Sequence, residues 1–76
     1  MLSPERLKEL LDDFPDARSV EVRRDRGVIA KVVSGTFTNR DEAERQADVW
    51  RYLQERLPDS DMDQIEFIFT DAPGEE

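Results

Sequence analysis

Apolar residues near the N-terminus recur at three- and four-residue intervals, the spacing of one helix face. They are Leu7, Leu10, Leu11 and Phe14. Ser3 is a favourable N-cap residue, Pro4 suits the first helical position, and Pro15 cannot continue a helix. The pattern therefore predicts an amphipathic helix over residues 2–14.

The next stretch changes to a period of two, which is typical of strands with one buried face. Two strands are predicted, over residues 19–24 and 27–34, joined by a short turn in which Gly27 takes positive φ. Their inward positions are Val20, Val22, Val28, Ala30 and Val32. Ile29 and Val33 fall on the outer face, so we expect them to be partly covered or to form a contact surface.

A helical period then returns and predicts a second helix, capped by Asn39 or Asp41 and running to about Leu57. Its predicted buried stripe is Ala43, Gln46 or Ala47, Trp50, Leu53 and Leu57. This phase places Trp50 in the core and Tyr52 towards the edge of the stripe, where it is the more exposed of the two.

Pro58 and the polar residues after it break the second helix, and a last strand follows. The residues of that strand alternate between two sets. The first set is Ile65, Phe67 and Phe69, and the second set is Gln64, Glu66 and Ile68. The alternation predicts that the first set faces the core and that Ile68 lies on the outer face. Residues 1–70 then form one domain, and residues 71–76 form a frayed acidic tail.

The predicted order of elements is α-β-β-α-β, an α+β fold. The second and third strands are joined through a helix, so if they are neighbours they run parallel. Each helix has one apolar face, and the simplest packing places both helices on one face of a three-stranded mixed sheet. The other face of the sheet is then free unless a partner covers it.

Charge is unevenly placed along the chain. The net charge is −8, and all of it resides in residues 39–76, which hold twelve acidic and four basic side chains. Such an excess repels phosphate backbones and so disfavours non-specific binding of nucleic acid. It favours basic protein partners.

The sequence contains no His and no Cys, which excludes disulfides and every thiolate or imidazole ligand to a metal. A domain this small without Cys is typical of the cytoplasm. The apolar runs are too short to span a bilayer, and the N-terminus lacks the hydrophobic region of a signal peptide. We expect a cytoplasmic domain that carries no cofactor.

Carboxylates suggest two kinds of chemistry, and neither is well supported. Asp59, Asp61 and Asp63 alternate as in a calcium loop, but the loop's required Gly and Glu are replaced by Gln64 and Thr70. General acid–base catalysis would need a nucleophile, a His or a Gly-rich cradle beside the carboxylates, and none accompanies them. We therefore assign no catalytic and no metal-binding residue, and we expect no enzyme activity.

Several residues at the end of the second strand and in the second helix carry a family resemblance. Ser34 ends the strand and Phe37 comes a few residues after it, and Arg45-Gln46-Ala47-Asp48-Val49-Trp50 follows in the helix. With the predicted order of elements, this arrangement resembles the BolA-like family, which has the class II KH-like topology. The family's helix motif reads Arg-His-Arg-x-Val/Ile-Tyr. The resemblance implies a small adaptor or regulator, in processes such as transcription regulation and the stress response.

The chain departs from the family at the positions that would hold a metal cluster. Gln46 replaces the His of the helix motif, and Ala47 replaces the second Arg. The family's cluster-ligating His would fall within residues 65–70, where this chain has none. BolA-like proteins commonly pair with monothiol glutaredoxins across a shared 2Fe–2S cluster, which needs thiolate or imidazole donors. The resemblance therefore implies the fold and a protein partner, without ligation of a cluster.

We expect partner contacts on the outer sheet face and on the second helix. The candidate residues are Arg45, Gln46, Tyr52, Ile29, Val33 and Ile68. One alternative is a nucleic-acid-binding KH-like module that uses the arginines of the hairpin tip, Arg23, Arg24 and Arg26, although the GXXG loop of KH domains is absent. Another is self-association through the sheet, so we expect a monomer or a weak homodimer.

Overall fold

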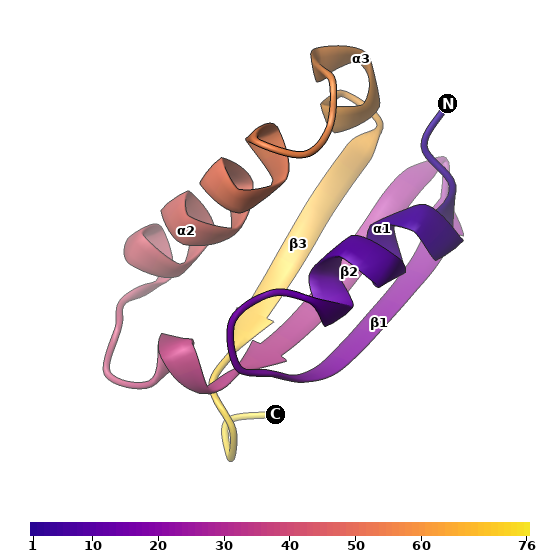
Figure 1. Cartoon of the computed structure of the whole chain (residues 1–76). Coiled ribbons are helices and arrows are strands. Elements are labelled where there is room, and N and C mark those ends of the chain that lie inside the picture. The colour runs from indigo at the N-terminus through magenta and orange to yellow at the C-terminus, as the bar shows by residue number, and fades with distance from the viewer.

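The computed structural model describes all 76 residues, and its strands and long helices follow the predicted order (Figure 1). The elements are α1 (Pro4–Asp12), β1 (Ala17–Asp25), β2 (Gly27–Ser34), the 3-10 turn η1 (Gly35–Phe37), α2 (Glu42–Gln54), α3 (Asp59–Met62) and β3 (Ile65–Asp71). The short elements η1 and α3 were not predicted. The α+β fold, with both long helices on one face of the sheet, is confirmed.

The sheet has the strand order β1-β2-β3. β1 and β2 pair antiparallel as a hairpin, and β2 and β3 pair parallel through the crossover that contains α2. β1 and β3 are therefore the two edge strands, and β2 is buried between them. This mixed arrangement is the predicted one.

The hairpin turn uses a different residue from the one predicted. Arg26 has a positive φ (67°), and Gly27 does not. Gly27 is required for another reason: a Cβ there would lie 2.7 Å from the carbonyl oxygen of Gln64. The glycine thus allows the start of β3 to approach the start of β2 closely.

Both long helices begin with side-chain caps. Ser3 Oγ accepts the backbone N–H of Arg6 at 3.1 Å, as the sequence predicts. Asp41 caps α2, and with Glu44 it forms a capping box in which each side chain accepts a backbone N–H of the other residue. These caps fix where each helix starts and therefore which face it turns to the sheet.

The buried stripe of α2 is shifted from the predicted one. It consists of Arg45, Val49 and Leu53, while Ala43 and Ala47 are exposed. Trp50 is half-buried at the margin of the core, so its predicted placement inside the core is wrong. The reason is Arg45, a charged residue that is buried because its guanidinium finds acceptors, as described below.

The strand β3 contains a bulge that changes which residues face the helices. Val28 pairs with Ile65 but the next residue of β2, Ile29, pairs with Phe67, so Glu66 is the extra residue. Ile65 and Ile68 both lie in the core, and Phe67 and Phe69 are exposed. The prediction that Phe67 and Phe69 face the core and Ile68 faces outward is therefore wrong.

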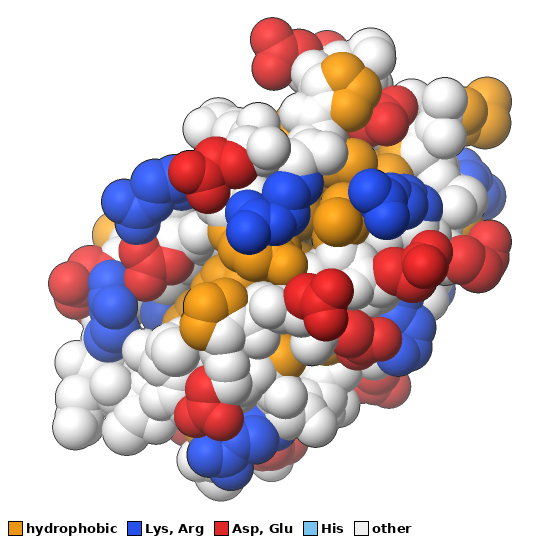
Figure 2. Space-filling view, in the orientation of Figure 1, with side chains coloured by type: hydrophobic (Ala, Val, Ile, Leu, Met, Phe, Trp, Pro, Cys, Tyr) orange, Lys and Arg blue, Asp and Glu red, His pale blue; other side chains and the backbone are white.

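Sixteen buried apolar residues form one continuous core between the helices and the sheet. Viewed from the side on which α1 lies, the hydrophobic side chains show along the seam between the helices, and charges of both signs are interspersed around them (Figure 2). No helix is both long and apolar enough to cross a membrane.

Of residues 71–76, the predicted tail, Asp71 and Ala72 belong to the folded domain and residues 73–76 are exposed. Asp71 ends β3, and Ala72 is buried in the core. The carboxylate of Glu75 accepts two hydrogen bonds from the guanidinium of Arg45 and one from the backbone N–H of Ala72. The tail thus closes back on itself and on α2.

Candidate functional site

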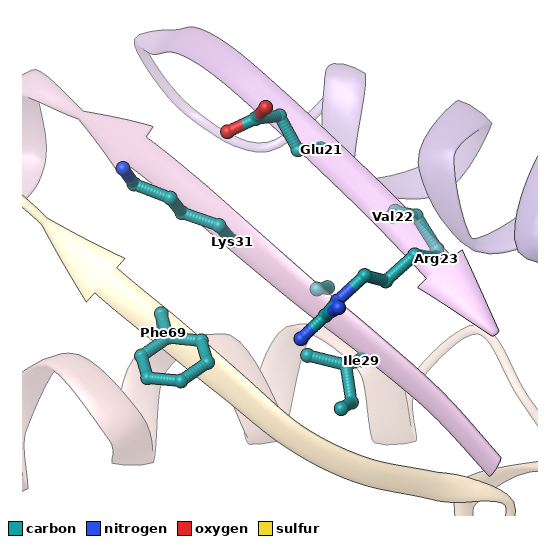
Figure 3. A pocket seen from close by; sticks show the side chains of 7 residues that line it. Glu21, Val22, Arg23, Ile29, Lys31 and Phe69 are labelled. Atoms are coloured by element: carbon teal, nitrogen blue, oxygen red, sulfur yellow. The ribbon is translucent and has the colours of Figure 1, made fainter. Parts of the chain in front are cut away.

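The face of the sheet that points away from the helices is left without cover by this chain (Figure 1 and Figure 3). Residues that pair across neighbouring strands point to the same face. Three cross-strand rows make up this outer face: Arg23–Ile29–Phe67, Glu21–Lys31–Phe69 and Ser19–Val33–Asp71. We call these nine residues the outer face.

Two aromatic side chains dominate the outer face. Phe67 is 47% exposed and Phe69 is 51% exposed, and apart from Met1 they are the only exposed large hydrophobic residues. Their ring centroids lie 4.6 Å apart at an interplanar angle of 69°, a T-shaped pair. The bulge at Glu66 places both rings on this face, next to the half-buried Ile29.

A shallow hollow lies beside the aromatic pair. Its lining residues come from all three strands: Glu21, Val22, Arg23, Ile29, Ala30, Lys31 and Phe69. Figure 3 shows the side chains of Arg23, Ile29, Lys31 and Phe69 on the side of the sheet opposite to the helices. Lys31 Nζ lies 3.8 Å from Asp71 Oδ2, whereas Glu21 and Arg23 form no ion pair within the chain.

Two of the predicted contact residues are not available on this surface. Val33 is only 3% exposed, and it lies outside the continuous core, on the outer face. Ile68 is fully buried on the helix side. Ile29 is where the sequence predicts, and the apolar contribution expected of Ile68 comes from Phe67 and Phe69 instead.

The side chain of Arg45 is buried, and its guanidinium donates hydrogen bonds to three other residues. Nε donates to the carbonyl of Arg40 at 2.8 Å, and Nη1 donates to the carbonyl of Thr70 at 3.3 Å. The bidentate pair with Glu75 completes its contacts. The hydrogen bond from Arg45 lowers the pKa of Glu75 to about 2, and the bond from Ala72 N–H acts in the same direction.

Gln46 bonds α2 to the outer edge of β3. Its Nε2 donates to the carbonyl of Ile68 at 2.8 Å and to Glu42 Oε1 at 2.9 Å, and its Oε1 accepts the indole N–H of Trp50 at 2.9 Å. Thr70 Oγ1 also donates to Glu42 Oε1. The polar atoms of Arg45 and Gln46 are therefore already paired within the chain, and both residues fasten the helix to the strand.

A search of solved structures found the protein BolA1 from Arabidopsis thaliana. It superposes on this chain with a TM-score of 0.71 at 18% sequence identity, over 100% of this chain and 99% of that chain. The chain has a BolA-like fold. No family model and no curated protein matches the sequence.

In this BolA-like fold the residues that carried the sequence resemblance are structural. Ser34 Oγ donates to the carbonyl of Pro15 at 2.7 Å and accepts the backbone N–H of Thr36, so it joins the end of β2 to the loop after α1. Phe37 is fully buried, with its ring 5.5 Å from that of Phe14. These two residues and Arg45 hold the start of the crossover in place.

Tyr52 lies on the other side of the molecule from the aromatic pair, between α2 and the end of α1. Its hydroxyl donates to the carbonyl of Leu10, and its ring meets Phe14 edge-on at 5.1 Å. Burial raises the pKa of the Tyr52 hydroxyl. The ring borders a second shallow hollow, but its hydroxyl is already bonded within the chain.

The three arginines of the hairpin do not form one cluster. Arg23 lies on the outer face, while Arg24 occupies a position of the opposite parity and donates to the carbonyl of Leu2 at 3.2 Å. Arg26 occupies the left-handed position of the turn. Because Arg23 and Arg24 lie on opposite faces of the sheet, the three arginines do not make one continuous basic groove that would follow a phosphate backbone.

The aspartates after the second helix have no loop geometry suited to calcium. Asp59 and Asp61 lie in the short helix α3, and Asp63 follows as its C-cap residue. No group of three or more His, Cys, Asp or Glu side chains in the chain is placed to hold a metal ion.

Proposed function

We propose that this BolA-like domain is a non-enzymatic adaptor that binds another protein through its outer face. The observation that supports this most strongly is the exposed aromatic pair. Phe67 and Phe69 leave about half of each ring in water on a strand whose other face is fully packed. Aromatic residues, Phe among them, are enriched in the buried core of protein interfaces.

The surroundings of the pair suit a partner with apolar side chains at its contact. Ile29 extends the apolar area on the neighbouring strand, and Arg23 and Lys31 lie at its border. A protein partner would cover the two rings and place polar groups against the border. The acidic surface elsewhere on the chain would favour a basic partner during encounter.

We further propose a monothiol glutaredoxin as the partner class, on the strength of the sequence resemblance. The chain has no thiolate or imidazole to offer a 2Fe–2S cluster, because it contains no Cys and no His. The binding surface would therefore be independent of cluster ligation. A glutaredoxin should bind equally well with and without its cluster.

Titration calorimetry and co-elution with a monothiol glutaredoxin, apo and cluster-loaded, test both parts. We expect similar affinities for the two forms. The double variant Phe67→Ser/Phe69→Ser should weaken binding at least about tenfold, because hot-spot aromatic residues carry much of the binding energy. The matched double variant Phe67→Leu/Phe69→Leu keeps the apolar area and should lose less.

Three results would count against different parts of the proposal. No binding to either form would overturn glutaredoxin as the partner, and binding only to the loaded form would overturn independence from cluster ligation. Binding that is unchanged in the serine variant would overturn the outer face as the surface. Circular dichroism of each variant establishes that it is folded before the comparison is made.

A further inference from the structure

The outer edge of β1 is unpaired from residue 18 to residue 25. β1 is the terminal strand of the sheet and spans nine residues, Ala17–Asp25. Between residues 18 and 25, its backbone forms no hydrogen bond outside the ladder with β2. A long free edge presents a row of donors and acceptors that another strand can pair with.

The side chains along this edge include two charges of opposite sign that form no ion pair within the chain. Glu21 and Arg23 are both exposed, and neither forms an ion pair within the chain. They are two residues apart, so both belong to the outer face. Val22 lies between them on the helix side and is only half-buried.

We propose that two copies of this chain associate through antiparallel pairing of their β1 strands, with the two-fold axis at Val22. This register places Glu21 of each copy directly opposite Arg23 of the other copy. Two opposite-charge pairs form across the axis, and each stabilises an antiparallel contact. The half-buried Val22 side chains meet each other on the helix side, and the two sheets become one sheet of six strands.

The neighbouring registers are disfavoured by charge. Sliding one β1 strand along the other by two residues keeps every side chain on its own face of the sheet. Such a slide moves the two-fold axis by one residue, to Glu21 or to Arg23. With the axis at Glu21, two glutamates lie directly opposite each other. With the axis at Arg23, the two copies of Arg23 lie directly opposite each other, and Glu21 of each copy lies opposite Asp25 of the other. Like charges in these positions destabilise strand pairing, so the charge sequence selects the register at Val22.

The same register continues the charge pattern that already exists within one copy. Glu21 lies opposite Lys31 in the β1–β2 ladder. In the dimer, Glu21 would lie between Lys31 of its own chain and Arg23 of the second copy. The outer face would then alternate in sign across the junction and leave Phe67 and Phe69 uncovered at its two ends. This association is therefore independent of the partner site proposed above.

Sedimentation velocity over micromolar to millimolar concentrations tests this proposal. The unmodified chain should pass from monomer to dimer, and the transition should move to higher concentration as salt is added. The variants Glu21→Arg and Arg23→Glu each place like charges across the axis and should weaken self-association at least about tenfold. The control Glu55→Arg, at the C-cap position of α2, makes the same charge change away from β1 and should leave self-association unchanged.

Mixing the two weakened variants gives the sharpest result. Glu21→Arg has two arginines on the edge, and Arg23→Glu has two glutamates, so each fails with itself but complements the other. An equimolar mixture should form a heterodimer, and the double swap Glu21→Arg/Arg23→Glu should recover the homodimer. A chain that stays monomeric at millimolar concentration, or a dimer that the single reversals do not weaken, would overturn the proposal. Phe67→Ser/Phe69→Ser should still dimerise, which separates this result from the partner test.

Discussion

The two edge strands of the sheet, β1 and β3, differ in whether side chains of the chain bond to their outer edge. The carbonyls of Ile68 and Thr70 on β3 accept hydrogen bonds from the side chains of Gln46 and Arg45, so α2 seals that edge. The corresponding edge of β1 receives no such bonds. The faces of the two strands differ as well, because β3 carries the exposed aromatic pair and β1 carries unpaired charges.

This difference shows that a domain this small can protect an edge strand with side chains from a helix alone. Two side chains of α2, Arg45 and Gln46, donate to the carbonyls of Thr70 and Ile68 on β3 without another strand. The tail carboxylate of Glu75 accepts from Arg45 and so holds that donor in place. Such sealing prevents further strand addition at β3. It leaves β1 as the one edge through which the sheet can grow.

The contrast between the two faces of β3 gives the largest expected effect on stability. Ile68→Ala removes a fully buried side chain and should lower the free energy of unfolding by about 2–5 kcal/mol. Phe69→Ala, one residue along the strand but half exposed, should lower it by less than about 1.5 kcal/mol, mainly through loss of the aromatic pair. Urea unfolding of the two variants measures both losses. The reverse order would mean that the strand has no bulge at Glu66.

Much of the fold could be predicted because it is specified by local sequence signals. The cap at Ser3, the period-two pattern of residues 27–34 and the break at Pro58 each depend on a few neighbouring residues. The parallel pairing of β2 with β3 follows because a helix joins them. The family resemblance rested on the same regions, and the likeness to the BolA1 structure agrees with it at the level of fold.

The outer sheet face and Ile29 could be predicted, but the aromatic pair of the candidate site and the burial of Arg45 could not, because they depend on two exceptions to periodicity. A bulge at Glu66 moves Phe67 and Phe69 to the outer face, and strict alternation cannot reveal an inserted residue. On α2, a pattern of apolar residues cannot reveal that Arg45 is buried. That burial depends on acceptors at Arg40, Thr70 and Glu75, which come from distant parts of the chain.

Breaking the seal on β3 should have the next largest effect. Gln46→Leu keeps the volume of the side chain but leaves the carbonyl of Ile68 and the indole N–H of Trp50 without a partner. We expect a loss of about 1–3 kcal/mol in the free energy of unfolding, the usual cost of orphaned polar groups. Gln54→Leu, at an exposed position of the same helix, is the matched control and should change stability by less than about 0.5 kcal/mol. Equal losses in the two variants would show that the Gln46 bonds do not stabilise the edge.

The tail carboxylate should contribute the smallest effect, and its signature is a dependence on pH. The pKa of Glu75 falls from an ordinary 4.5 to about 2 in the folded chain, because Arg45 and the N–H of Ala72 bond to the ionised form. A carboxyl whose pKa is lowered by folding stabilises the fold fully above its unfolded pKa. That contribution is lost as the pH falls from about 4.5 through about 2.

Comparison with Glu75→Gln isolates this contribution from the other carboxylates of the chain. The unmodified chain should be the more stable of the two above pH 5, by a margin that is roughly constant, and the margin should shrink steadily as the solution is acidified towards pH 2. Glu76→Gln, one residue further along and without a bond to Arg45, should show no such narrowing. If the stability difference between the two chains does not change with pH, the bond between Glu75 and Arg45 does not form in solution. The seal on β3 would then consist of the side chains of α2 alone.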